Sequence, residues 1–346
     1  MNKSFDPNAA CVPNNQYFGF PYTPQEASLL LLAVPWEVTT SYQEGTAKGP
    51  QAILEASYQL DFYDADIPQA WNLGIGTFPS GTSDGVALSS MNLRPLAKKI
   101  IHWTEENKED ENLAEDLALV NQASEMLNDW VYEQAQEVLQ KGKKMGIVGG
   151  DHSVPLGYLK ALAEKYTNFG ILHIDAHADL RKAYEGFTYS HASIMYNALQ
   201  IPSLSSLVQI GLRDICEEEI NRASADKRIW QFSDANMQAN TFRGITWEKQ
   251  CASMLAQLPQ KVYISFDIDG LDPSLCPHTG TPVPGGLSYG QVVFLLKELW
   301  RSGREIIGFD LCEVAPASNE VNTWDGNVGA RILYLLGCIT LASKDK

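Results

Sequence analysis

Three short apolar runs in this chain are each followed by aspartate or histidine residues, and this arrangement constrains the fold more than any other feature. The runs cover residues 145–148, 169–174 and 261–266. Runs of this length are typical of buried strands, and in open parallel α/β sheets binding sites form beyond the carboxyl ends of the strands. The sequence therefore predicts a parallel sheet with a polar site at its carboxyl edge.

The run 169–174 is followed by Asp175, His177 and Asp179. Side chains two residues apart on an extended backbone point the same way, so these three can converge on one point. Two carboxylates and an imidazole form a mixed oxygen and nitrogen set, which suits a divalent transition ion better than calcium. The alternative interpretation is a strand end with solvated acids and a core histidine.

The other two runs add further residues of the same kind. Paired glycines at 149 and 150 allow a sharp turn before His152, and Asp267 and Asp269 follow the run 261–266 with strand spacing. Crowded carboxylates repel and raise each other's pKa, so two divalent cations would balance this set and lower the pKa of a shared water, which favours hydrolysis. The predicted metal ligands are His152, Asp175, His177, Asp179, Asp267 and Asp269.

Segments 149–153 (GGDHS), 175–179 (DAHAD) and 265–273 (SFDIDGLDP) resemble, in the same order, the three signatures of the ureohydrolase family, which includes arginases, agmatinases, guanidinobutyrases and guanidine hydrolases. The resemblance runs from about residue 34 to the end of the chain. It implies a three-layer α/β/α domain around a mostly parallel, doubly wound sheet. It also implies two Mn²⁺ ions, or Ni²⁺ in some members, and hydrolysis of a small cationic guanidino substrate to urea and an amine.

The resemblance also implies roles for individual residues. Glu313, in the segment 308–316, matches the glutamate that grips the guanidinium, and a carboxylate accepts such a planar fork of N–H donors in bidentate fashion. His191 matches the histidine that shuttles a proton to the leaving amine, and a histidine titrates near neutral pH. The alternatives are a surface acid after a strand and an ordinary loop histidine. The resemblance also implies how the ligands are divided. His152 and Asp179 would bind one ion, His177 and Asp269 would bind the other, and Asp175 and Asp267 would bridge the two.

Two departures from the family pattern count against arginine as the substrate. Arginases carry an acid two positions after the Gly-Leu-Arg-Asp strand, whereas here Asp214 is followed by Ile215 and Cys216. The loop 180–190 also lacks the Asn and Ser/Thr pattern that arginases use on the α-carboxylate, and it resembles the loop of agmatinase-type members. We therefore predict agmatine as the substrate, with free guanidine or guanidinobutyrate as alternatives.

The segments 36–42 and 324–331 resemble the subgroup that contains guanidine hydrolases. Bulky aromatic residues there could close a pocket around a very small cation through cation–π contact. The alternative for both aromatic residues is core packing, because large aromatics also dominate protein cores. The predicted substrate-pocket residues are Trp36, Thr39, Thr40, Asp214 and Trp324.

Strand-like and helical segments alternate along the chain, which favours one doubly wound, mostly parallel sheet. The predicted strands are 29–34, 145–148, 169–174, 207–212, 262–266 and 305–311, and the predicted helices are 121–141, 154–165, 247–258, 289–301 and 324–341. We expect a single domain over residues 1–346, with a polar N-terminal extension (about 1–27) and an acidic surface insertion (about 104–116).

The composition of the chain indicates which kinds of binding partner and which cellular compartment to expect. A net charge of −16 repels phosphate backbones, so we expect no nucleic-acid partner. The longest apolar run is too short to span a bilayer, so we expect no membrane contact. Six scattered cysteines without zinc-type pairing, and no signal-peptide pattern, favour a cytoplasmic protein with reduced thiols. The family resemblance implies a homo-oligomer, a trimer or a hexamer.

Other functional classes fit the sequence less well. A binding protein derived from such an enzyme would be expected to have lost a ligand, and all six positions are filled. Deacetylases of related fold use one zinc and would not need Asp267 and Asp269 together with His152. Phosphoester hydrolases would need basic residues around the metals, where this chain supplies acids.

Overall fold

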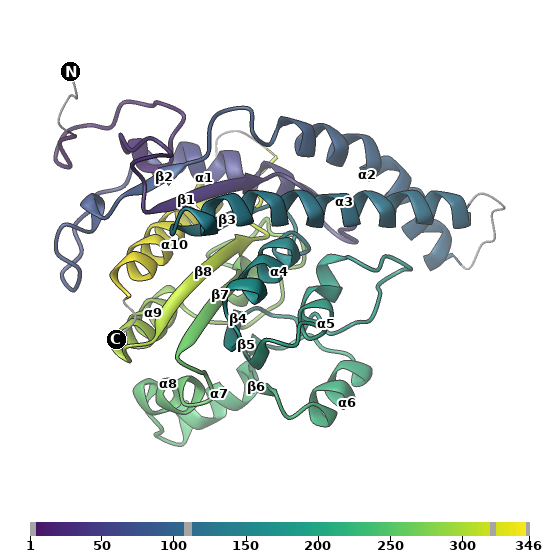
Figure 1. Ribbon diagram of the computed structural model, residues 1–346. Coiled ribbons are helices and arrows are strands. Elements are labelled where there is room, and N and C mark those ends of the chain that lie inside the picture. The colour runs from purple at the N-terminus through teal and green to yellow at the C-terminus, as the bar shows by residue number, and fades with distance from the viewer. Residues whose placement is uncertain (1–4, 107–112, 319–322, 344–346) are drawn as a thin grey trace.

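The core of the molecule is an eight-stranded sheet in which every paired strand runs parallel to its neighbour (Figure 1). The computed structural model describes residues 5–106, 113–318 and 323–343. The strands are β1 (Leu29–Val34), β2 (Ile75–Thr77), β3 (Lys144–Gly149), β4 (Phe169–Ile174), β5 (Leu204–Leu212), β6 (Ile229–Ser233), β7 (Lys261–Asp267) and β8 (Glu305–Cys312). Their order across the sheet is β2-β1-β3-β8-β7-β4-β5-β6.

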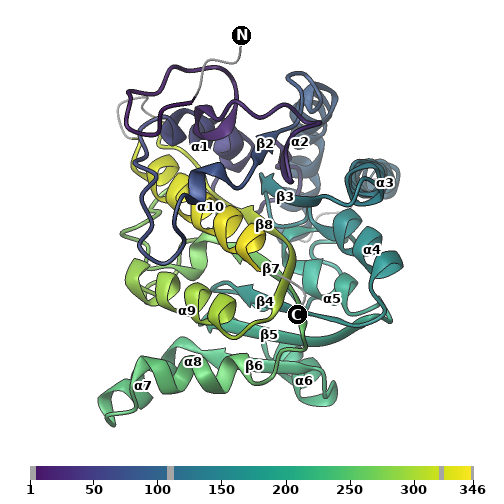
Figure 2. The ribbon, with the colours of Figure 1, turned by 60° about the vertical axis from the view of Figure 1, so that its left-hand side comes forward.

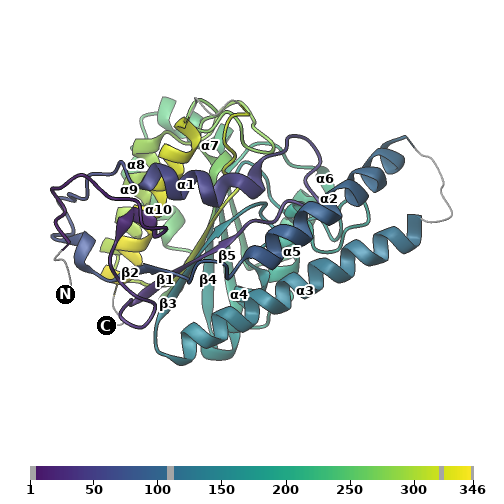
Figure 3. The ribbon, with the colours of Figure 1, turned by 90° about the horizontal axis from the view of Figure 1, so that it is seen from above.

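Helices cover both faces of this sheet and form two separate hydrophobic cores with it (Figure 2). One core contains residues of α1 (Gly49–Ser57), α7 (Asp234–Phe242), α8 (Trp247–Leu255), α9 (Tyr289–Arg301) and α10 (Trp324–Ala342). The other contains residues of α2 (Asp84–Glu105), α3 (Leu113–Gln140), α4 (Leu156–Lys165), α5 (Ile194–Ala198) and α6 (Glu217–Ala225). The predicted three-layer α/β/α fold is therefore confirmed. Seen from above, α2 and α3 extend as a pair beyond the sheet (Figure 3).

Local sequence explains where these elements form. Strand β4 is buried at every position, because helices cover both of its faces, and this agrees with its nearly continuous apolar run. Helix α9 begins with a capping box, in which the Ser288 hydroxyl accepts from the Gln291 N–H and the Gln291 side chain accepts from the Ser288 N–H. The short strand β2 and the half-exposed edge strand β6 lack a continuous apolar run, and the sequence analysis did not predict them.

The segment predicted as a polar extension contributes to the core. Phe18 and Phe20 are fully buried, and both rings contact Tyr334 of α10. The predicted acidic insertion, about 104–116, falls at the connection between α2 and α3, and its residues 107–112 lie outside the described part of the chain. Within the described residues, no helix combines the length and apolar character that a bilayer span requires.

The strand order determines where the site forms. Strands β3, β8, β7 and β4 lie next to one another at the centre of the sheet and run in the same direction. The register pairs Phe266 of β7 with Ile174 of β4 on one side and with Leu311 of β8 on the other. The residues that follow these positions therefore leave the sheet side by side, at its carboxyl edge.

Candidate active site

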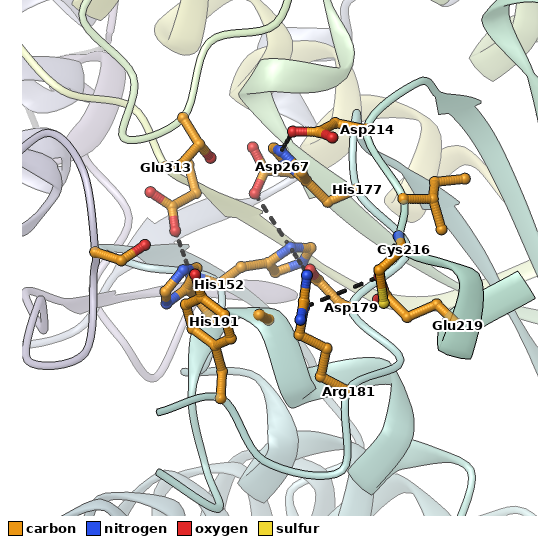
Figure 4. A pocket seen from close by; sticks show the side chains of 15 residues that line it. His152, His177, Asp179, Arg181, His191, Asp214, Cys216, Glu219, Asp267 and Glu313 are labelled. Atoms are coloured by element: carbon orange, nitrogen blue, oxygen red, sulfur yellow. Dashed lines mark hydrogen bonds and ion pairs between the residues drawn. The ribbon is translucent and has the colours of Figure 1, made fainter. Parts of the chain in front are cut away.

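The six predicted metal ligands converge at the carboxyl ends of three central strands. Figure 4 shows four of them, His152, His177, Asp179 and Asp267. His152 follows β3, three ligands follow β4, and two come from the end of β7 and the single helical turn after it. Five of the six are buried, and the side chain of His177 is 23% exposed toward the cavity described below. Residues distant in sequence thus form one compact polar cluster.

His152 is the centre of the first ligand set. Its Nδ1 atom lies 3.1 Å from Oδ2 of Asp175, 3.3 Å from Oδ2 of Asp179 and 3.2 Å from Oδ2 of Asp267. Donor atoms bound about 2.1 Å from one ion at octahedral angles lie roughly 3 Å apart. The three distances from Nδ1 are of this size, and the donor atoms of His152, Asp175 and Asp179 all lie within 4.8 Å of one another, as ligands of one divalent ion would.

His177 is the centre of the second ligand set. Its Nδ1 atom lies 3.4 Å from Oδ1 of Asp175 and 3.1 Å from Oδ2 of Asp269. Asp175 therefore presents one carboxylate oxygen to each imidazole, which is the geometry of a ligand shared by two ions. The Oδ1 atom of Asp267 accepts a hydrogen bond from the backbone N–H of Asp269 over 2.9 Å, which fixes the Asp267 carboxylate relative to the turn that carries Asp269.

The electrostatics of the cluster favour bound cations. Burial, together with repulsion from Asp269 and Asp175, raises the pKa of Asp267 well above its usual range. Burial alone would lower the pKa of His152, but hydrogen bonds to the surrounding carboxylates raise it well above its usual value. Asp267 in particular lacks nearby positive charge, which two divalent ions would supply. The residues present therefore fit a metal pair.

Glu313 follows β8 and lies beside the first ligand set (Figure 4). Its Oε1 atom accepts a hydrogen bond from the backbone N–H of His152, whereas its Oε2 atom is buried and has no partner among the described residues. Burial and repulsion by Asp151 raise the pKa of Glu313 well above its usual range. The residue also has a positive φ of 64°, an unusual conformation for a side chain of this size, so its placement is constrained.

His191 begins the 3₁₀ turn before α5 and lines the same cavity. Burial, followed by the charge of His177, lowers the pKa of His191 to about 3, so its imidazole is neutral at pH 7 in this state of the site. Its Nδ1 atom has no hydrogen-bond partner among the described residues. The free nitrogen can accept a hydrogen bond, and the low pKa means that the ring, once protonated, gives its proton up readily.

A cavity of about 230 Å³ opens over the cluster. Its wall includes residues that the sequence analysis did not predict as site residues, among them Ser41, Arg181, Tyr184, Glu219 and Thr281. The Arg181 guanidinium lies over the Tyr184 ring at 4.9 Å, and its Nε atom is 4.0 Å from Oε2 of Glu219. Glu219 is buried and accepts hydrogen bonds from the backbone N–H groups of Leu180 and Cys216. A cation and an anion therefore lie together on this wall.

Of the predicted pocket residues, the structure places one in the lining of this cavity. Asp214 has a side chain that is 72% exposed, and its Oδ2 atom is 3.9 Å from Nε2 of His177. Trp36 packs instead in a hydrophobic core, where its side chain is buried, and its backbone lies directly against Gly150. Thr39 and Thr40 are buried outside the lining. Trp324 is 47% exposed at the start of α10, where its indole N–H donates to the Ser274 carbonyl.

The fold and the cluster together define a three-layer α/β protein. At the carboxyl edge of its sheet it carries a set of residues suited to binding divalent metal ions. The sequence profile of the arginase family matches residues 27–336. The chain is 34% identical over 300 residues to the N(1)-aminopropylagmatine ureohydrolase of Thermus thermophilus, a match that covers 86% of this chain and 87% of that protein.

Two further matches agree with this assignment. The chain is 28% identical to the agmatinase of Bacillus subtilis, over 91% of this chain and 93% of that protein. The structure of the agmatine ureohydrolase of Thermoplasma volcanium shares the fold, with a TM-score of 0.71 over 95% of both chains at 22% identity. The chain therefore belongs to the arginase family of ureohydrolases, which hydrolyse the C–N bonds of guanidino groups.

Proposed function

We propose that this protein hydrolyses agmatine, or a closely related guanidino amine, to urea and an amine with the help of two divalent ions. The observation that carries the proposal is the position of Asp175 between the two imidazoles, with one carboxylate oxygen toward each. Mn²⁺ is the expected ion, with Ni²⁺ as the alternative. Each ligand set combines carboxylate oxygens with one imidazole nitrogen, and such mixed sets suit these divalent ions.

In this proposal the chain's own residues bind the substrate and move a proton. The free Oε2 atom of Glu313 receives the N–H groups of the guanidinium, since its partner oxygen is already held by the His152 backbone. His191 lies on the cavity wall and passes a proton to the leaving amine. When bound, the two ions neutralise the carboxylates and polarise water for attack on the guanidinium carbon.

The tail of the substrate is the less constrained part of the proposal. Relatives named for agmatine and aminopropylagmatine favour an amine tail. Asp214 and Glu219 near the cavity would attract an ammonium group on that tail. Arg181 on the same wall favours the second candidate, guanidinobutyrate, because a guanidinium attracts a carboxylate. Neither candidate needs the α-amino acid contacts that arginine would require.

Metal analysis combined with a substrate panel tests this function. We expect about two Mn²⁺ or Ni²⁺ ions per chain after loading, and urea release from agmatine, N-aminopropylagmatine or guanidinobutyrate in preference to arginine and free guanidine. One bound zinc ion per chain, or a clear preference for arginine, would contradict the proposal.

A further inference from the structure

A row of polar side chains crosses the buried sheet one level beneath the ligand cluster. The register places Gln231 of β6 beside Gln209 of β5, Gln209 beside His173 of β4, His173 beside Ser265 of β7, and Ser265 beside Asp310 of β8. We call these five residues the polar row; all but Gln231 are fully buried. Buried polar groups in the middle of an otherwise apolar parallel sheet are unfavourable unless their hydrogen bonds are satisfied.

Hydrogen bonds connect the polar row to the proposed shared ligand. Gln231 donates to the side-chain oxygen of Gln209 over 3.0 Å. The Gln209 amide nitrogen lies 2.7 Å from the carbonyl oxygen of Ala178 and 2.9 Å from Nδ1 of His173. On the other side of the same ring, Nε2 of His173 lies 2.8 Å from Oδ2 of Asp175.

These contacts determine which nitrogen of His173 carries the proton. The Ala178 carbonyl can only accept, so the Gln209 amide must face it with its nitrogen, and the second N–H of that amide then points at His173 Nδ1. Nδ1 must accept, and the ring proton is on Nε2, from which it is donated to Asp175. The opposite amide orientation would place two oxygens 2.7 Å apart and is excluded.

The same orientation also rules out His173 as a ligand of an ion. A ligand role through Nε2 would move the proton to Nδ1, where it would face the N–H of Gln209. His173 is therefore a donor to a ligand. One oxygen of Asp175 is held by this donor, and the other faces the second set, so the plane of the shared carboxylate is fixed.

We propose that Gln209 and His173 are positioning residues for the metal pair: Gln209 fixes the tautomer of His173, and His173 in turn fixes the orientation of Asp175. This inference rests on the proposed function, since it concerns the ions that the site would bind. Partners of metal ligands commonly contribute 10- to 100-fold in metal affinity.

Three variants test this role. Gln209→Leu keeps the approximate shape of the side chain but removes the N–H that fixes the ring. His173→Leu removes the donor to Asp175, whereas His173→Gln returns an amide nitrogen close to the position of Nε2. Ser206→Ala is the control, because it removes a hydrogen bond of another buried side chain of the same strand, to the Gln257 carbonyl, without touching the polar row.

Mn²⁺ affinity is measured by competition with a chelator, and the stability of the chelator-treated proteins is measured by thermal unfolding. We expect a 10- to 100-fold loss of affinity in Gln209→Leu and His173→Leu, near wild-type affinity in His173→Gln and Ser206→Ala, and metal-free melting temperatures in the two leucine variants close to that of Ser206→Ala. Unchanged affinity in the leucine variants, or equal loss in His173→Gln and His173→Leu, would overturn the positioning role. A wild-type protein that binds no ion pair would instead refute the proposed function.

Discussion

The backbone N–H of His152 donates a hydrogen bond to Oε1 of Glu313 over 2.9 Å. The residue whose imidazole centres one ligand set thus also fixes the carboxylate that is proposed to hold the substrate. The other oxygen of Glu313, Oε2, remains buried without a partner among the described residues. In the proposed function this backbone contact would link the substrate-holding carboxylate to the first ligand set, and this link makes the role of Glu313 testable.

Replacing Glu313 with glutamine should abolish turnover and leave metal binding intact. Glutamine keeps an oxygen for the His152 N–H but presents an NH₂ group to a substrate that itself offers only N–H donors. We expect a loss of at least about 100-fold in kcat/KM, in the range for a lost charge-stabilising contact. Urea release and metal content measured on the same preparation check this prediction. Loss of metal from the variant would place Glu313 in the ligand set instead.

Gly280 leaves the space that Glu313 requires. A Cβ atom added at Gly280 would lie 2.8 Å from Oε2 of Glu313, which is closer than side chains tolerate. Because Oε1 is held by His152, the carboxylate cannot simply swing away, and we expect Gly280→Ala to lower kcat/KM by about 10- to 100-fold with metal content unchanged. Gly290→Ala on α9 is the control, since nothing lies within 4 Å of its added Cβ. Equal activity in the two variants would refute this steric role.

The Asp267→Asn variant should be more stable than the wild type without metal and less stable than the wild type with metal. Burial and neighbouring carboxylates raise the pKa of Asp267, so its ionised form destabilises the metal-free fold as the pH rises through that pKa. Asparagine removes this charge and retains the acceptor for the Asp269 N–H. Under chelator at neutral pH the variant should melt above the wild type. With saturating Mn²⁺ it should melt below, because only the wild type gains about 2.7 kcal/mol at 100 times Kd.

The chelator arm and the Mn²⁺ arm of this comparison separate two effects. If Asp267 were no ligand, the variant would remain the more stable protein in both conditions. If the charge of Asp267 did not destabilise the metal-free fold, the variant and the wild type would have the same melting temperature under chelator.

The sequence predicted the ligand cluster because each ligand lies within a few residues of a buried apolar run. In a parallel sheet all such runs end at the same edge, so the convergence of His152, Asp175 and Asp267 requires only that β3, β7 and β4 lie close together in the sheet, where only β8 separates β3 from β7. The fold was predictable for the same reason. The strand β2, with three residues, and the edge strand β6 have too little buried apolar sequence to be recognised.

The cavity wall was less predictable, because its residues come from loops and helix ends whose packing is a tertiary property. Arg181 and Glu219 meet only because the loop after β4 folds against the start of α6. Trp36 shows the converse case, since a large aromatic near a site in sequence can line the pocket or pack in the core, and Trp36 packs in the core. The polar row required the register of five strands, which the sequence alone does not supply.

Glu185 should make the stability of the protein depend on pH. Burial and repulsion by Glu105 raise the pKa of Glu185 from 4.5 to about 7. The folded state therefore holds this proton more tightly than the unfolded state, so the stabilisation is complete below pH 4.5 and is lost as the pH rises through about 7. Glu185→Gln should melt progressively higher than the wild type across this range, by a modest amount because the carboxyl is only half buried. Thermal unfolding between pH 4 and 8 under chelator checks this; a pH-independent difference would contradict it.

Arg181 should control which charge the protein accepts on the tail of its substrate. Its guanidinium lines the cavity, lies over the Tyr184 ring and is 4.0 Å from Glu219, so it adds positive charge to the wall along which a substrate tail would extend. Arg181→Met keeps the apolar stem but removes the charge and leaves Glu219 without its cation. An ammonium tail should then bind better and a carboxylate tail worse.

The expected change is a shift of about fivefold in the ratio of kcat/KM for agmatine over guanidinobutyrate, since partly exposed charge interactions contribute up to about 1 kcal/mol, which is a factor of about five. The shift should shrink at high salt, because the charges are partly solvated. Arg222→Met provides a matched control: Arg222 likewise lies over a tyrosine ring, that of Tyr196, at 4.6 Å, but does not line the cavity. A ratio that moves equally in both variants, or in neither, would show that the tail does not pass Arg181.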